Sequence, residues 1–123
     1  MPNLTSERKT REYLGNTFSL LAGEQIYAGA MVAVNASGKA VQATKAGNPV
    51  IGVALHSAAN GEPVAYRRGV FAFDNAATTP VTSAAIGGTC HVADDHTVDA
   101  TSGSAVAGTV LGFEEDQVIV KIQ

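Results

Sequence analysis

Short apolar runs separated by small-residue and polar turns dominate this chain and limit what it can fold into. In residues 30–35, Met31 and Ala33 alternate with Val32 and Val34, the two-residue period of a β-strand. Residues 36–39 form a polar turn, and residues 40–43 read as the returning strand. Such runs recur at roughly 8–12-residue spacing, which is typical of a β-sandwich or barrel. We therefore predict an all-β fold, a small β-barrel or β-sandwich of short antiparallel strands.

Further short apolar runs predict the remaining strands, and one segment is predicted to be helical. Pro63 places the start of its strand at a sheet edge or a bulge, and Gly69 is expected to interrupt the chain before the next strand. A single short helix is predicted over residues 80–86, closed by Gly87 and Gly88. The further strands are predicted at residues 18–21, 49–56, 62–68, 70–73, 89–93, 97–100, 108–113 and 117–122.

Charge is concentrated at the start of the chain. Residues 1–16 hold five charged side chains with few apolar residues between them, whereas only 15% of the whole chain is charged. A length of 123 residues is enough for one domain. We expect an N-terminal arm over residues 1–16 and a single β domain over residues 17–123.

The composition favours a protein that works within an assembly. Apolar residues make up 46% of the chain, and the charged share lies below the roughly 25% usual for soluble domains. A net charge of −3 argues against direct nucleic-acid binding, which needs clustered basic residues. No apolar run approaches the roughly 20 residues of a membrane span, so no membrane partner is expected.

Catalytic motifs are incomplete or absent. Gly38 and Lys39 resemble the end of a phosphate-binding loop, but Ala33 and Ala40 stand where that motif needs glycine and a hydroxyl. No Gly-x-Ser-x-Gly nucleophile elbow occurs in the sequence. We therefore predict that the protein is not an enzyme, with no catalytic residue and no cofactor.

One stretch has metal-ligand chemistry but a simpler explanation. His91, Asp94, Asp95, His96 and Asp99 lie within nine positions and could reach one ion at a hairpin tip. Asp-Asp-His is also ordinary turn material, because aspartate bonds its own backbone there. We predict no metal site.

The lone cysteine and a second acidic stretch also have simple explanations. Cys90 is the only cysteine and is expected to be a small buried hydrophobe in a reducing compartment. Residues 114–116 are acidic and are expected at the tip of the last hairpin, where water screens their charges.

Basic and aromatic side chains supply the candidate contact residues. Arg67 and Arg68 are adjacent on a predicted strand, so their side chains should leave on opposite faces. The planar fork of arginine favours interface contacts, although a solvated edge or an internal ion pair would also accommodate these two residues. We predict contacts with other protein subunits for Arg8, Lys9, Arg11, Tyr13, Arg67 and Arg68.

Seven segments have a characteristic order and spacing: residues 11–17, 26–33, 36–40, 50–54, 67–71, 92–95 and 107–112. In this order and spacing they resemble the capsid cement, or decoration, proteins of tailed bacteriophages. This resemblance implies a β-rich protein on the outer surface of the phage head, made in the host cytoplasm. It implies binding where major capsid proteins meet, as a homotrimer or alternatively a dimer, and bracing of the shell.

Two other functions remain open from the residues alone. A virion-surface adhesion or carbohydrate-binding module would need exposed aromatic rings, but the chain has no tryptophan and only 6% aromatic residues. A small β-barrel enzyme or metal protein would have to use His91, Asp95 and His96.

Overall fold

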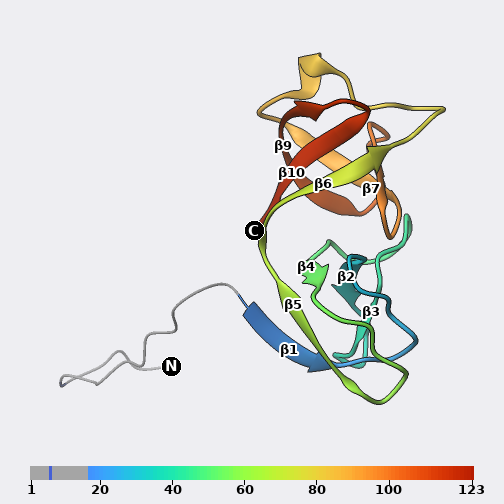
Figure 1. Ribbon diagram of the computed structural model, residues 1–123, viewed down its shortest axis with the longest axis vertical. Helices are drawn as coiled ribbons and strands as arrows, with labels where there is room; N and C mark the ends of the chain where they lie inside the picture. The colour runs from blue at the N-terminus through green and yellow to red at the C-terminus, as the bar shows by residue number, and fades with distance from the viewer. Residues whose placement is uncertain (1–5, 7–16) are drawn as a thin grey trace.

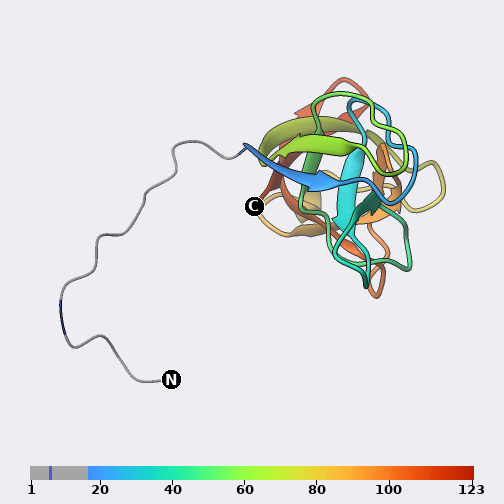
Figure 2. The same cartoon turned by 90° about the horizontal axis from the view of Figure 1, so that it is seen from below.

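The computed structural model describes residue 6 and residues 17–123, which form ten strands in two lobes stacked along the long axis (Figures 1 and 2). The lower group in Figure 1, here called the sheet lobe, contains β1 (Thr17–Leu21), β2 (Met31–Val34), β3 (Ala40–Gln42), β4 (Gly52–Ala54) and β5 (Pro63–Arg67). The upper group, the barrel lobe, contains β6 (Gly69–Asn75), β7 (Thr89–Asp94), β8 (Thr97–Asp99), β9 (Val106–Glu114) and β10 (Gln117–Ile122). The predicted all-β class is confirmed.

The sheet lobe is an antiparallel sheet in the order β1-β5-β4-β2-β3. A tight turn joins β2 to β3, in which the Asn35 side chain accepts hydrogen bonds from the backbone N–H groups of Ser37 and Lys39. Ala22, directly after β1, makes a bridge to Ala40 at the start of β3. The two outer strands therefore meet at one end and curl the sheet around its own core.

The barrel lobe closes in the order β10-β6-β8-β7-β9. Most neighbouring strands of the barrel are antiparallel, as predicted. The pair β6 and β8 is parallel instead, with Asp74 opposite Thr97. The expectation of antiparallel strands alone is wrong at this pair. A parallel pair needs a long crossover, and the loop, the short turn and β7 together provide one.

Local differences from the predicted elements have backbone causes. The predicted helix over residues 80–86 is reduced to one 3-10 turn, η1 (Ser83–Ala85). The strand predicted over residues 49–56 is reduced to β4, because the N–H of Val50 donates to Val106 O in the barrel lobe (3.0 Å) rather than to the sheet. In the described part of the chain, no helix is long and apolar enough to cross a membrane.

The passage from β5 to β6 follows the predicted interruption. Arg68 lies between the two strands, and Gly69 has a φ of 151°, which side chains rarely permit. Pro63 begins β5 opposite Leu21 of β1, beyond the two β5 residues, Tyr66 and Arg67, that pair with β4. Proline is tolerated there, although β5 lies inside the sheet, because that end of the strand has only one neighbour.

A shared core ties the lobes together. Most of the larger buried cluster comes from the barrel lobe, but Met31, Ala43, Val50 and Val53 belong to the sheet lobe. A smaller cluster, around Ile26, Val32 and Val64, lies within the sheet lobe. Burial of apolar side chains therefore stabilises both the individual lobes and their junction.

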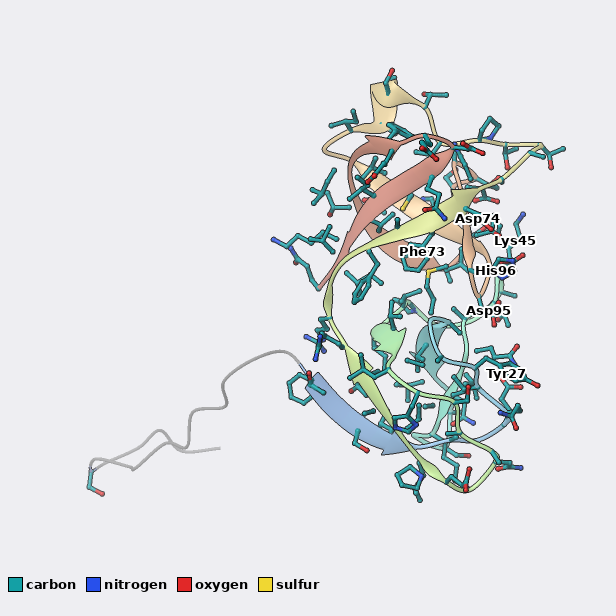
Figure 3. The ribbon with its side chains drawn as sticks, viewed as in Figure 1. Tyr27, Lys45, Phe73, Asp74, Asp95 and His96 are labelled. Atoms are coloured by element: carbon teal, nitrogen blue, oxygen red, sulfur yellow. The ribbon has the colours of Figure 1, made fainter. Side chains whose placement is uncertain are left out.

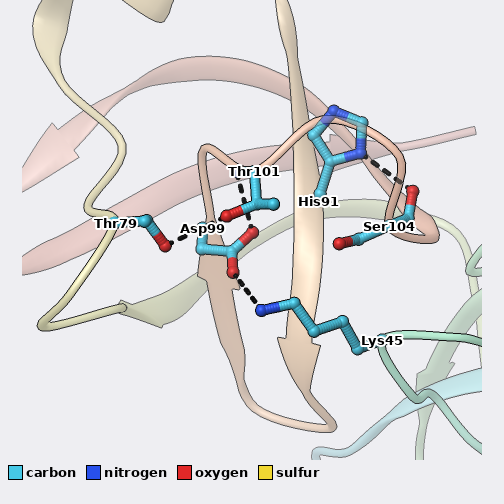
Figure 4. A network of polar contacts seen from close by, with 6 residues as sticks. All are labelled: Lys45, Thr79, His91, Asp99, Thr101 and Ser104. Atoms are coloured by element: carbon cyan, nitrogen blue, oxygen red, sulfur yellow. Dashed lines mark hydrogen bonds and ion pairs between the residues drawn. The ribbon is translucent and has the colours of Figure 1, made fainter.

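Polar contacts reinforce the same junction. The N–H of Met31 donates to Asp95 O (2.7 Å), and the N–H of Ala105 donates to Lys45 O (2.9 Å). The ammonium of Lys45 also donates to the buried Asp99 carboxylate at 3.3 Å (Figure 4). Asp99 accepts a further hydrogen bond from the N–H of Thr101, so its buried charge has two donors.

Candidate functional site

Arg67 and Arg68 both lie against β1, the outermost strand of the sheet lobe. The Nε–H of Arg67 donates to Thr17 Oγ1 at 3.2 Å, directly across the β1–β5 pair. The Arg68 guanidinium lies over the ring of Phe18, 5.7 Å from its centroid. The two side chains therefore leave on opposite faces, as strand alternation predicts.

An aromatic pair holds the Arg68 side of this surface in place. The rings of Phe18 and Tyr66 lie 6.1 Å apart and are tilted by 35°. Tyr66 is buried against Gly52, where an added Cβ would lie 2.7 Å from the tyrosine ring. Glycine at this position lets the ring pack onto the strand backbone, which fixes the support for Phe18 and Arg68.

Apolar side chains remain exposed around these arginines. Phe18, Leu21 and Val70 are 43%, 52% and 54% exposed. We call Phe18, Leu21, Arg67, Arg68 and Val70 the β1 surface, which includes residues on both faces of the sheet because the two arginines leave on opposite faces. Arginine combined with exposed apolar and aromatic groups is the composition favoured at protein interfaces.

The other predicted contact residues lie outside the described part of the chain. These are Arg8, Lys9, Arg11 and Tyr13, all within the predicted arm of residues 1–16. Their segment joins the body at Thr17, the first residue of β1. Their contact role stays a prediction, as does that of Arg67 and Arg68.

The five residues considered for a metal do not converge. Asp94, Asp95 and His96 lie together in the β7–β8 turn, with ligand atoms within 4.8 Å of one another. His91 Nδ1 instead contacts Ser104 O (3.1 Å), and the Asp99 carboxylate pairs with Lys45. The cluster consists of exposed or half-buried turn residues that already bond one another.

The other sequence candidates occupy hairpin turns. Gly38 and Lys39 lie in the β2–β3 turn rather than between a strand and a helix, as a phosphate-binding loop would require. The acidic residues 114–116 span the β9–β10 turn and are exposed.

Cys90 is fully buried, as its sequence context predicts. Burial raises the pKa of its thiol to about 11, and the Sγ–H donates weakly to Gly108 O at 3.7 Å. Because only the thiolate is nucleophilic, we expect iodoacetamide at pH 8 to leave Cys90 unmodified in the folded protein and to alkylate it in denaturant. Mass spectrometry of the two samples checks this, and rapid alkylation of the folded protein would contradict it.

A family comparison bears directly on the sheet lobe and the β1 surface. Residues 13–69 match the phage cement protein family. The matched segment contains β1 to β5 and ends at the first residue of β6. The match confirms the resemblance predicted from the sequence and supports a phage capsid cement role, with the protein as a component of the virion capsid. A search of curated proteins finds no match.

Sequence reasoning missed one site-like feature of this structure. Tyr27 is 63% exposed and lines a pocket between the lobes together with Asp95 and His96. The only available signal was its place before Gly29, a turn glycine with φ of 89°. Nothing in the sequence could bring it to a turn almost seventy residues away.

Proposed function

We propose that this protein is a structural, non-enzymatic cement protein that binds the outside of a phage head where major capsid proteins meet and stabilises the shell. The family match over residues 13–69 is the observation that carries this proposal. The proposal assigns the protein no catalytic residue and no cofactor.

The β1 surface is the contact region we assign to this role, together with the arm of residues 1–16. Residues 1–16 directly precede β1 in the chain, so the two assigned contact regions are adjacent in the sequence. In the described part of the chain, β5 is the only strand that pairs with β1. The outer edge of β1 therefore offers backbone hydrogen-bonding groups to a partner.

Many copies make such a role effective. A small surface binds weakly by itself, but repetition across a shell and association of the protein with itself raise the total affinity. We propose a homotrimer, with a dimer as the alternative, and assembly on particles in the host cytoplasm. A buried, unpaired Cys90 is compatible with that reducing compartment.

The direct test compares shells with and without this protein. Purified shells that lack it are mixed with the protein, and the temperature at which they release DNA is followed by dye fluorescence. We expect bound protein to raise the release temperature. If saturated shells release DNA at the same temperature as bare shells, the stabilising role is wrong.

The contact assignment is tested by removing the arm and by changing Arg68. Deletion of residues 1–16 is expected to weaken shell binding about tenfold or more, and Arg68→Ala roughly fivefold, because interface arginines and ordered arms concentrate binding energy. Co-sedimentation with shells measures both variants.

Lys39→Ala, in the exposed β2–β3 turn, is the matched loss of a basic side chain and is expected to bind like the original protein. Circular dichroism checks that each variant remains folded. Full binding by the folded arm deletion would overturn the role of the arm, and equal effects of R68A and K39A would overturn that of the β1 surface.

A further inference from the structure

A pocket of about 290 Å³ opens where the sheet lobe meets the barrel lobe. Tyr27 reaches it from the segment before β2, and Asp95 and His96 reach it from the β7–β8 turn, all on one side of the molecule (Figure 3). The pocket is separate from the β1 surface. Its lining consists of Tyr27, Ala28, Gly29, Ala30, Asp95 and His96.

The wall of this pocket is held in place and is rich in hydrogen-bond acceptors. The backbone N–H groups of Ala28, Gly29 and Ala30 donate to Ser57 Oγ, Ala54 O and Tyr27 O, at 3.0, 2.9 and 3.1 Å. Within residues 17–123, the carbonyl oxygens of Ala28 and Gly29 accept no hydrogen bond. These carbonyls and the Asp95 carboxylate are the acceptors that the wall can offer to a ligand.

The electrostatics of the pocket favour a positive ligand. Asp95 lines it, Asp94 adjoins it in the same turn, and Asp74 of β6 lies near enough to influence His96. Within residues 17–123, no lysine or arginine forms an ion pair with these three carboxylates. The same residues hold nine of the eleven acidic and only five of the eight basic side chains of the chain.

When it is protonated, His96 is a cation beside this group of carboxylates. Its Nδ1 lies 2.9 Å from Asp95 Oδ1 and 3.1 Å from Asp94 Oδ1. The hydrogen bond with Asp95 and the charges of Asp94, Asp95 and Asp74 raise the pKa of His96 above its usual value. Below that pKa the imidazolium competes with any other cation, and above it the carboxylates lose this partner.

We propose that the pocket receives an arginine side chain presented by a partner protein. The guanidinium plane can stack on the exposed Tyr27 ring while its N–H groups donate to Asp95 and to the carbonyls of Ala28 and Gly29. Arginine fits better than a sugar, because a neutral sugar gains no attraction from the charges of Asp94, Asp95 and Asp74. This site goes beyond the proposed cement function and does not depend on it.

The test uses the isolated full chain and two small probes. Nα-acetyl-arginine amide is titrated into ¹⁵N-labelled protein, with the citrulline analogue as a neutral probe of nearly the same shape. We expect the arginine probe alone to shift the amide signals of Tyr27, Gly29, Asp95 and His96. Tyr27→Ala and Asp95→Asn are each expected to weaken its binding roughly threefold, the size usual for an exposed cation–π or ion-pair contact.

Asp116→Asn is the matched control, since it removes an exposed carboxylate that does not line the pocket and should leave binding unchanged. Binding of the arginine probe is expected to strengthen as the pH rises from 5.5 to 8, and His96→Gln should abolish that dependence. A purely structural role for the turn would not produce this difference.

Several results would overturn the proposal. Equal shifts with the citrulline probe would show that the charge of arginine is not what the pocket recognises. If the arginine probe gives no shifts up to its solubility limit, the pocket is not an arginine site. Shifts at the pocket with galactose or glucose, but not with the arginine probe, would make it a carbohydrate site. Shifts with calcium alone would make it a metal site.

Discussion

Replacing Gly108 with alanine is expected to lower the free energy of unfolding by about 3 kcal/mol. Gly108 lies in β9 and faces Cys90 of β7. An added Cβ would lie 2.3 Å from Lys121 O and 2.8 Å from Val120 Cγ1. Because the first of these atoms belongs to the backbone of β10, relief requires the β9–β10 pair to separate at the closure of the barrel. Urea denaturation followed by circular dichroism measures the loss.

Gly112→Ala is the matched control for this substitution. Gly112 lies in the same strand, and a Cβ there would meet no atom within 4 Å. We expect its free energy of unfolding to stay within about 0.5 kcal/mol of the original value. If G108A is as stable as G112A, the tight approach of β9 to β10 does not limit the fold.

Replacing Met31 with alanine is expected to cost about 3 kcal/mol of stability. Met31 belongs to β2 of the sheet lobe, yet its fully buried side chain packs in the core cluster dominated by the barrel lobe. Removing it leaves a cavity at the junction of the lobes. We therefore expect amide hydrogen exchange to accelerate in both β4 and β10, with the overall loss of stability measured by urea denaturation.

Met31→Leu conserves volume and is expected to cost less than about 1.5 kcal/mol. The same experiment tests the prediction that residues 17–123 form one domain. A single cooperative transition of the original protein, with β4 and β10 protected to a similar extent, is the expected result. Two separate transitions, or faster exchange in M31A confined to β4, would mean that the lobes fold independently.

Local pattern was a sound guide to most strands and turns of this protein. The alternation over residues 30–35 and the turn at residues 36–39 correspond to β2, β3 and the Asn35 turn between them. The Asp-Asp-His turn and the acidic tip at residues 114–116 are also where they were expected. These features depend on neighbours in the chain, so side-chain periodicity and turn chemistry suffice to predict them.

Long-range pairing was beyond the reach of such patterns. No local sequence pattern indicates that β8 lies parallel to β6. None indicates that Val50, two residues before β4, donates a backbone hydrogen bond to Val106 in the barrel lobe. The predicted helix over residues 80–86 shortened to η1, in which no residue is buried. A few exposed helical residues gain little from packing, and short isolated helices are unstable in water.

The same distinction between local pattern and long-range packing applies to the β1 surface and to the pocket between the lobes. The sequence by itself determined the all-β class, most hairpins, the concentration of charge in residues 1–16 and the resemblance to phage cement proteins, because all of these follow from residue order and spacing. Only the tertiary structure decided that Arg68 stacks on Phe18, that Met31 of one lobe fills the core of the other, and that Tyr27 meets Asp95. Those contacts depend on how the two lobes pack, and packing follows the total burial of apolar surface rather than any single segment.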